Sequence, residues 1–352
     1  MLKIAVVNDS LLAAESLRRV VDSVPEYKLV WTACNGYEAV QRCSEHCPDI
    51  ILMDLIMPEM DGVEATRRIS ADFDCAILIV TATVDGHTGK VFEAMGAGAL
   101  DAVNTPVLGE SGQGEGRDSL IHKIDTIALL LHSKPYRRTR PVAAARNPLP
   151  AIGGVPLIAI GASTGGPSAL REILQALPAN PGVAIAIVQH VDEQFSAGFT
   201  DWLDAHAPLP VRLAKPGDRF EPGTALVCGR EDHLVLTSGG TLDYTPEPRE
   251  LAYRPSVDVF FNSLAENYSN QTVGVLLTGM GKDGAAGLKA MRERGWLTLA
   301  QDKETCAVYG MPKAAKELDA AKEILPLGNI GPRLAEWAER ASSRGREKLI
   351  SG

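Results

Sequence analysis

The chain has 352 residues, enough for two domains, and its 45% hydrophobic and 22% charged content is typical of globular proteins. A formal net charge of −9 argues against general binding to nucleic acid or anionic membranes, because both need concentrated Lys and Arg. The cysteines form no C-x-x-C pair, no apolar run is long enough to insert in a membrane, and an early Asn-Asp pair argues against a signal peptide, so we expect a cytoplasmic protein.

Residues 1–132 alternate between short apolar runs and amphipathic stretches, which predicts a first α/β domain. Strands are predicted over residues 3–8, 28–33, 49–55, 76–82 and 99–104. Helices are predicted over 11–24, 62–73 and 118–132, with a Gly-rich insert at 109–117. The apolar runs are continuous rather than alternating, which favours a parallel sheet covered on both faces. We therefore expect a doubly wound, five-stranded, flavodoxin-like domain.

Residues 133–154 are rich in Pro, Arg and Ala and have no sustained periodicity, so we interpret them as an interdomain linker. The α/β pattern resumes in residues 155–345, which predicts a second doubly wound domain. Its core strands are predicted over 157–160, 183–189, 272–278 and 296–301. Residues 223–237, GTALVCGREDHLVLT, have the pattern of a β-hairpin inserted in this domain.

Polar residues end the predicted strands of the first domain. Asp9, Asp54, Thr81 and Thr105 each follow an apolar run, and the carboxyl ends of parallel strands share one edge of a sheet. Two carboxylates with nearby carbonyl groups form an oxygen-only site suited to Mg²⁺, and an Asp beside this ion can act as a nucleophile toward phosphate. The alternative is that each Asp only caps a helix, but the whole set favours a functional site.

In the second domain, residues 161–165 (GASTG) fit the pattern G-x-S-x-G around Ser163. Small residues on both sides of a serine permit a sharp strand-to-helix turn that exposes its hydroxyl group. Backbone N–H groups at the helix start can then bind a developing oxyanion. By itself the pattern is weak evidence and favours a tight loop that has no catalytic role.

His190 and Asp283 strengthen the catalytic interpretation, because each follows another apolar run. Three strand ends would then bring Ser, His and an acid to one edge, where the base takes the serine proton and the acid orients the base. The chain order Ser, His, Asp differs from that of the α/β-hydrolases, so we expect a different fold. His233 is a rival base, but its position in the predicted hairpin indicates a surface or structural histidine.

A competing hypothesis uses the same residues. Gly279 to Gly284 fit G-x-G-x-x-G after a strand, and Asp302 follows at the distance expected of a ribose-binding acid. This would indicate an NAD(P)-dependent oxidoreductase, but it leaves Ser163 and His190 without a role. A further alternative is a non-catalytic docking scaffold, which the Ser, His and Asp set argues against.

The first domain resembles a response-regulator receiver domain. The resemblance rests on Asp9, on Thr81 and on the segments DLIMPEMDG (54–62) and GALDAVNTP (98–106). It implies that a histidine kinase phosphorylates Asp54, with Mg²⁺ held partly by Asp9. The chain differs from the usual receiver pattern at three positions, where it has Asn8, Ala102 and Thr105 in place of an acid, an aromatic residue and a lysine.

The second domain resembles the catalytic domain of chemotaxis protein-glutamate methylesterases through the segments IGASTGG, VQH, TGMGKDGA and AQDKETCAVYGMP. The resemblance implies Ser163 as nucleophile, His190 as base and Asp283 as orienting acid. It also implies an oxyanion donor at the Met280 N–H and an active-site position for Thr164.

The reaction implied by this resemblance is hydrolysis of γ-glutamyl methyl esters on chemoreceptor helices, with deamidation of receptor glutamines in some members and no cofactor for the esterase step. It further implies that the unphosphorylated receiver inhibits the esterase. The Asn8 and VNTP (103–106) variations are similar to those of methylesterases in surface-sensing systems.

Overall fold

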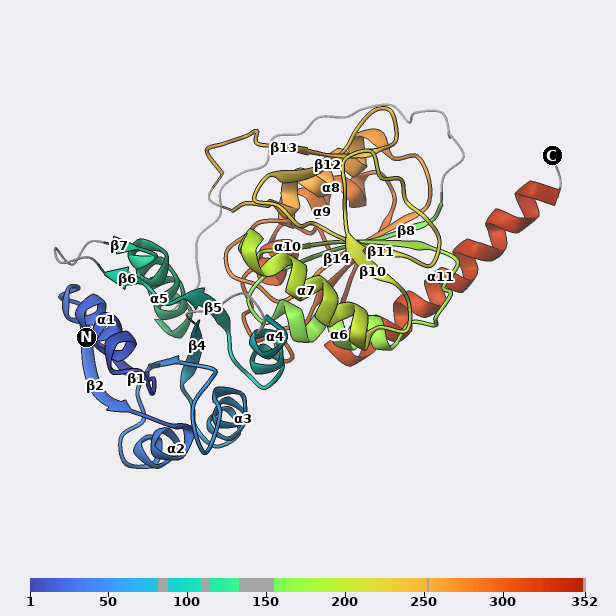
Figure 1. Cartoon of the computed structure of the whole chain (residues 1–352). Helices are drawn as coiled ribbons and strands as arrows, with labels where there is room; N and C mark the ends of the chain where they lie inside the picture. Colours follow the sequence, from blue (N-terminus) through green and yellow to red (C-terminus); the bar gives the residue numbers. More distant parts are fainter. Residues whose placement is uncertain (82–87, 109–113, 133–154, 252, 351–352) are drawn as a thin grey trace. The chain divides into compact units, whose positions relative to one another are not determined.

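The computed structural model describes residues 1–81, 88–108, 114–132, 155–251 and 253–350. The chain divides into two compact units, Met1–Arg138 and Thr139–Gly352, and each has its own parallel sheet (Figure 1). The predicted linker, residues 133–154, lies outside the described residues. None of the helices in the described ranges has the length and apolar content needed to cross a bilayer.

The described residues of the first unit form a five-stranded parallel sheet in the order β2-β1-β3-β4-β5. Its strands are β1 (Leu2–Val7), β2 (Tyr27–Ala33), β3 (Ile50–Met53), β4 (Ala76–Thr81) and β5 (Asp101–Asn104). The helices are α1 (Leu11–Asp22), α2 (Gly36–Glu45), α3 (Gly62–Asp72), α4 (Thr88–Gly96) and α5 (Arg117–His132). Every residue of β3 and β4 is buried, so the predicted doubly wound sheet is confirmed.

The local sequence explains where α3 begins. Asp61 caps the helix by accepting the Glu64 N–H, and a Cβ at Gly62 would lie 2.0 Å from the carbonyl oxygen of Asp54. Glycine therefore lets α3 start directly against the end of β3. Two short antiparallel strands, β6 (Val107–Leu108) just before the insert and β7 (Gly114–Glu115) within it, flank residues 109–113, which lie outside the described residues.

In the second unit, the residues with described structure form a seven-stranded parallel sheet in the order β10-β11-β9-β8-β14-β15-β16. The strands are β8 (Leu157–Ala162), β9 (Ala184–Gln189), β10 (Val211–Leu213), β11 (Ala225–Val227), β14 (Thr272–Leu276), β15 (Leu297–Gln301) and β16 (Glu323–Leu325). The helices are α6 (Gly166–Gln175), α7 (Glu193–His206), α8 (Val257–Asn267), α9 (Ala285–Glu293), α10 (Met311–Glu317) and α11 (Leu327–Ile350).

The strand order reverses at β8. The chain first continues from β8 to its neighbour β9 and later returns to β14 on the other side of β8. Helices α6, α7 and α11 cover one face of this sheet, whereas α8 and α9 cover the other (Figure 1). In parallel α/β sheets, such a reversal leaves a crevice at the carboxyl ends of the central strands, where ligands bind. The residues that follow β8, β9 and β14 therefore meet at this position.

The predicted hairpin at residues 223–237 is only partly correct. Its first part, β11, is wholly buried and pairs in parallel with β9 in the main sheet. The antiparallel hairpin instead joins β12 (His233–Leu236) to β13 (Leu242–Thr245). Its turn contains Ser-Gly-Gly, and Gly240 has a φ of +75°. The apolar run of β11 is typical of a parallel core strand, which the hairpin prediction overlooked.

Candidate active site

Ser163 lies between the end of β8 and the start of α6. Its N–H donates to the carbonyl of Thr278 at 3.0 Å, and its own carbonyl accepts from the N–H of Gly166 at 2.7 Å. The residue is only 7% exposed. A Cβ at Gly279 would lie 2.7 Å from the Cβ of Ser163, so glycine allows the loop after β14 to approach the serine closely.

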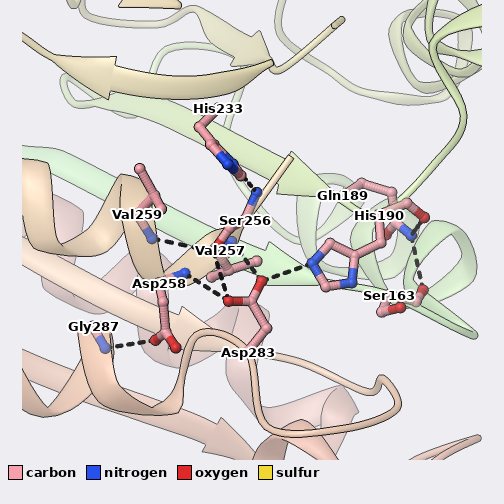
Figure 2. Close-up of polar contacts among 10 residues, drawn as sticks. All are labelled: Ser163, Gln189, His190, His233, Ser256, Val257, Asp258, Val259, Asp283 and Gly287. Carbon is pink, nitrogen blue, oxygen red and sulfur yellow. Dashed lines mark hydrogen bonds and ion pairs between the residues drawn. The ribbon is translucent and has the colours of Figure 1, made fainter. Parts of the chain in front are cut away.

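His190 follows β9 and donates its backbone N–H to Ala162 at 3.0 Å. Its Nε2 lies 2.8 Å from Oδ2 of Asp283. With an ionised carboxylate and a neutral ring, we assign the ring proton to Nε2, which leaves the lone pair on Nδ1. Nδ1 is buried and has no hydrogen-bond partner in the described part of the chain. Figure 2 shows the ring between Asp283 and Ser163.

The structure thus brings Ser163, His190 and Asp283 together, but their contacts are unequal. A hydrogen bond joins the histidine to the acid, whereas no hydrogen bond joins the described serine to the unpaired Nδ1. Hydrogen bonds of catalytic groups are often long in free enzymes and tighten when substrate binds. The arrangement is therefore compatible with proton transfer from Ser163 to Nδ1.

Asp283 is held by the first turn of α8 as well as by His190. Its carboxylate accepts from the Ser256 hydroxyl at 2.8 Å and from the N–H groups of Val257 at 2.7 Å and Asp258 at 3.1 Å (Figure 2). Burial alone would raise the pKa of Asp283, but the hydrogen bond and charge of His190, with the bonds from Ser256 and Val257, lower it overall. The carboxylate is therefore ionised beside the base.

Asp258 makes the reverse contact. It belongs to the first turn of α8, yet its Oδ1 accepts the N–H of Gly287 in the first turn of α9 at 2.7 Å. Burial, with the negative charge of Asp283 as a smaller cause, raises the pKa of Asp258 to about 6. Asp283, which precedes α9, thus binds the N-terminus of α8, and Asp258, which lies in α8, binds the N-terminus of α9.

His233 is excluded as the base because both of its ring nitrogens are used. Nδ1 accepts the N–H of Ser256 at 3.0 Å, and Nε2 donates to the carbonyl of Pro248 at 3.2 Å. The side chain is wholly buried, so His233 is a structural residue and not a surface one. Its role is to hold the Ser256 cap that in turn contacts Asp283.

Thr164 and Met280 lie in the turns beside Ser163. Thr164 is buried, and its carbonyl accepts the hydroxyl of Thr278 at 2.9 Å. Met280 follows Gly279, the residue that approaches the Cβ of Ser163. Within the described ranges, no acceptor is recorded for the backbone N–H of either Thr164 or Met280. Two backbone donors are therefore available near the serine, as an oxyanion site requires.

The glycine-rich motif and Asp302 make contacts within the protein itself. Asp283, inside the motif, faces His190, and a Cβ at Gly281 would lie 2.5 Å from the hydroxyl of Tyr253. Asp302 accepts the N–H and the hydroxyl of Thr305 and so stabilises its own turn. These contacts give the loop and Asp302 local roles that need no nucleotide.

In the first unit, Asp54 follows β3 and Asp9 lies just after β1. Burial is the main reason that the pKa of Asp54 rises to about 6, although N–H groups of Leu55 and Ile56 lower it, and the charge of Asp9 raises it further. The Asn8 side chain is used locally, because its Oδ1 accepts a hydrogen bond from the Ser10 N–H at 2.8 Å. The two carboxylates thus interact at one edge of the sheet.

Thr81 and Thr105 end the neighbouring strands at that edge. The N–H of Thr105 donates to the carbonyl of Thr81 at 2.9 Å, and Thr81 is buried. Oγ1 of Thr105 is buried without a hydrogen-bond partner among the described residues. The position where receivers usually carry a lysine therefore presents a short hydroxyl group here.

Several residues of the second-unit site were missed at the sequence level. Gln189 is 2% exposed, and its Nε2 donates to the carbonyls of Ser163 at 2.8 Å and His190 at 3.0 Å (Figure 2). A polar residue at the end of an apolar strand was the available signal for it. For Ser256 and Asp258, the signal was a helix-capping pattern. That pattern did not reveal that the Ser256 hydroxyl and the Asp258 N–H would donate to Asp283.

A parallel α/β sheet that presents a serine, a histidine and a buried carboxylate beyond adjacent strand ends is typical of α/β serine hydrolases. In this chain that unit is joined to a second α/β unit, which carries Asp9 and Asp54 at the edge of its sheet. The family comparisons agree with this class. Residues 158–334 match the CheB methylesterase family, and residues 4–110 match the response regulator receiver domain. The chain belongs to the CheB methylesterase family.

Relatives match along nearly the whole chain. Protein-glutamate methylesterase/protein-glutamine glutaminase 1 of Burkholderia lata is 53% identical over 338 residues, which cover 96% of this chain and 99% of the relative. The Pseudomonas aeruginosa protein with the same name and the number 3 is 52% identical over 337 residues, covering 95% and 99%. The crystal structure of the Thermotoga maritima CheB methylesterase catalytic domain is 36% identical, covers 53% of this chain and 100% of that one, and has a TM-score of 0.49. The sequence relatives support a methylesterase over an oxidoreductase or a scaffold.

Proposed function

We propose that this chain is a phosphorylation-regulated serine hydrolase that removes methyl groups from glutamate γ-methyl esters on chemoreceptor helices, and so serves adaptation in a chemosensory pathway. One observation carries the proposal. His190 lies between Asp283 and Ser163, with Nε2 bonded to the carboxylate and Nδ1 unpaired. Because those receptor helices are cytoplasmic, we propose the same location for this protein.

In the first half of the reaction, Oγ of Ser163 attacks the ester carbonyl carbon while Nδ1 of His190 accepts its proton. Asp283 stabilises the imidazolium that forms, and it needs no rearrangement because it already accepts from Nε2. The tetrahedral oxyanion is bound by the backbone N–H groups of Thr164 and Met280.

In the second half, the C–O bond to the methoxy group breaks and Nδ1–H of His190 protonates the leaving group, which departs as methanol. A water molecule then attacks the acyl-enzyme and transfers its proton to Nδ1. Collapse of this second intermediate releases glutamate and restores the hydroxyl of Ser163. A receptor glutamine would follow the same steps with ammonia as the leaving group, and the names of the relatives support both activities.

Asp54 is the proposed phosphoacceptor, and a chemotaxis histidine kinase is the proposed donor. The donor set fits Mg²⁺, because Asp9 and Asp54 are oxygen ligands close enough for one charge to raise the pKa of the other. Bound Mg²⁺ would neutralise charge during phosphoryl transfer. The hydroxyl groups of Thr81 and Thr105 are the proposed switch positions at the same edge.

We assign residues 1–132 to the receiver, 133–154 to the linker and 155–345 to the catalytic domain. The matched ranges, 4–110 and 158–334, fall within the two proposed domains and support this division.

The direct test of the nucleophile is methanol release from methylated receptor by the intact Ser163→Ala variant. We expect a fall of about three orders of magnitude or more. Ser238→Ala, at an exposed serine in the β12–β13 turn, is the matched control and should release methanol at the wild-type rate. Unchanged release by Ser163→Ala would exclude Ser163 as the nucleophile.

Regulation is tested with the intact chain, Mg²⁺ and a small phosphodonor such as acetyl phosphate. We expect the phosphodonor to increase turnover of the wild type and to leave Asp54→Asn unchanged. Equal stimulation of both would show that Asp54 is not the acceptor.

A further inference from the structure

Tyr253 stacks on the imidazole of His190. The two ring centroids are 4.7 Å apart and the planes differ by only 8°. Tyr253 precedes α8 by a few residues, so it comes from a different part of the chain than the histidine. Burial, followed by the charge of Asp283, raises the pKa of Tyr253, so the stacked ring is a neutral phenol.

The imidazole has few other restraints. Its Nε2 makes one hydrogen bond to Asp283, and its Nδ1 has no partner in the described residues. Rotation about the second side-chain torsion of histidine is broad, because this bond joins a tetrahedral carbon to a planar ring. One hydrogen bond at one edge leaves much of that rotation open, whereas a parallel ring against the face opposes it.

The same tyrosine reaches the loop that carries the proposed oxyanion donor. A Cβ at Gly281 would lie 2.5 Å from the Tyr253 hydroxyl, so the phenol packs directly on the backbone after Met280. Gly281 has a φ of +80°, a conformation that favours glycine, and this residue type also makes room for the hydroxyl. Tyr253 therefore contacts both the base and the neighbouring loop.

We propose that Tyr253 is a positioning residue that holds the plane of His190 with Nδ1 toward Ser163 and favours the imidazolium formed during catalysis. An electron-rich ring face attracts a cation placed against it, so the stack becomes more favourable when the imidazole is protonated. This inference rests on the proposed function, because it concerns the same base.

The test compares Tyr253→Leu and Tyr253→Met, which remove the aromatic face, with Tyr253→Phe, which keeps it. In the intact protein we expect the two aliphatic variants to lower kcat about tenfold, with KM nearly unchanged, because the lost interaction forms mainly with the cation. Tyr253→Phe should restore most of the rate. Tyr37→Leu, at an exposed tyrosine of the first unit, is the control and should match the wild type.

A spectroscopic measurement separates positioning from a general loss of structure. With labelled histidine, the Cε1–H resonance of His190, identified by its absence in His190→Gln, should be shifted by the tyrosine ring current in the wild type and in Tyr253→Phe. The shift should be lost in Tyr253→Leu while the melting temperature stays close to that of the wild type.

Two results would overturn the role of Tyr253: an aliphatic variant with wild-type kcat, or a Phe variant as slow as the Leu variant. The Ser163→Ala variant is assayed alongside. If wild-type activity depends on Ser163 but not on Tyr253, only the positioning role fails and the proposed function stands.

Discussion

Replacing Asp283 with asparagine tests the carboxylate that joins the base to α8. Among the described residues, Oδ2 accepts from His190 and from the N–H of Val257, and Oδ1 accepts from the Ser256 hydroxyl and the N–H of Asp258. An amide has one oxygen and one NH₂ group. In either orientation, the NH₂ group therefore faces a backbone N–H that cannot accept a hydrogen bond.

The expected cost follows from this mismatch. A buried N–H group without a partner costs about 1–3 kcal/mol, and hydrogen bonds to the lost charge add to it, so the free energy of unfolding should fall by about 2–4 kcal/mol at pH 7. The ring of His190 also loses the acceptor that sets its tautomer. We expect kcat to fall by about four orders of magnitude, the scale seen when the acid of such a triad becomes an amide.

The stability difference should depend on pH. Folding lowers the pKa of Asp283 from its ordinary value of 3.8, because its hydrogen bonds outweigh the effect of burial. A carboxyl group with a lowered folded pKa contributes stability above its unfolded pKa and loses this contribution as the pH falls through the folded pKa. The gap between wild type and Asp283→Asn should therefore be full at pH 7 and begin to close below about pH 4.

Urea unfolding of the intact chain at several pH values, with ester hydrolysis measured in parallel, checks both expectations. Asp201→Asn, at an exposed aspartate of α7, is the matched control and should change neither quantity. An Asp283→Asn protein with wild-type stability at pH 7 and wild-type turnover would refute the reasoning about this carboxylate.

Three other substitutions test further features, two in the second unit and one in the first. In Gly279→Ala, the new Cβ would lie 2.7 Å from that of Ser163, so kcat should fall at least about tenfold, whereas Gly239→Ala, with its nearest contact at 3.6 Å, should retain full turnover. Gln189→Met removes two donors to backbone carbonyls and should lower the free energy of unfolding by about 1–3 kcal/mol in urea titrations; an unchanged midpoint would contradict this role. The pKa of Asp54 is raised to about 6, so the wild type should lose stability as the pH rises from about 4 through 6. Asp54→Asn should lack this dependence and be about 1–2 kcal/mol more stable at pH 7 in Mg²⁺-free buffer, and parallel pH curves for the two proteins would exclude the effect.

The position of the site could be predicted from the sequence because parallel sheets gather their carboxyl ends. Ser163 and His190 each follow an unbroken apolar run, and Asp283 follows another after a short glycine-rich loop. Strand ends therefore specify which residues meet, even when more than 90 residues separate them, as they separate His190 from Asp283. The same reasoning located Asp9 and Asp54 at the edge of the first sheet.

The orientation of the groups could not be predicted in the same way. Which nitrogen of His190 contacts the acid depends on the torsions of one side chain and on packing by Tyr253, which lies in a segment without periodicity. Likewise, the sequence around His233 has the pattern of a hairpin residue, and only the fold brings its ring to Ser256 and Pro248. Side-chain contacts between remote loops have no periodic signal in a single sequence.

The paired carboxylates explain how the acid of the site remains charged although it is buried and has no Lys or Arg bonded to it among the described residues. Asp283 accepts from the first turn of α8, and Asp258 accepts from the first turn of α9, so each acid binds the positive end of a helix dipole. The two charges repel, and the pKa of only one of them rises: that of Asp258, to about 6. The pKa of Asp283 is instead lowered, because it has the additional bonds to His190 and Ser256. Reciprocal capping thus joins α8 to α9, and the unequal bonding makes the carboxylate that faces the base the harder of the two to protonate.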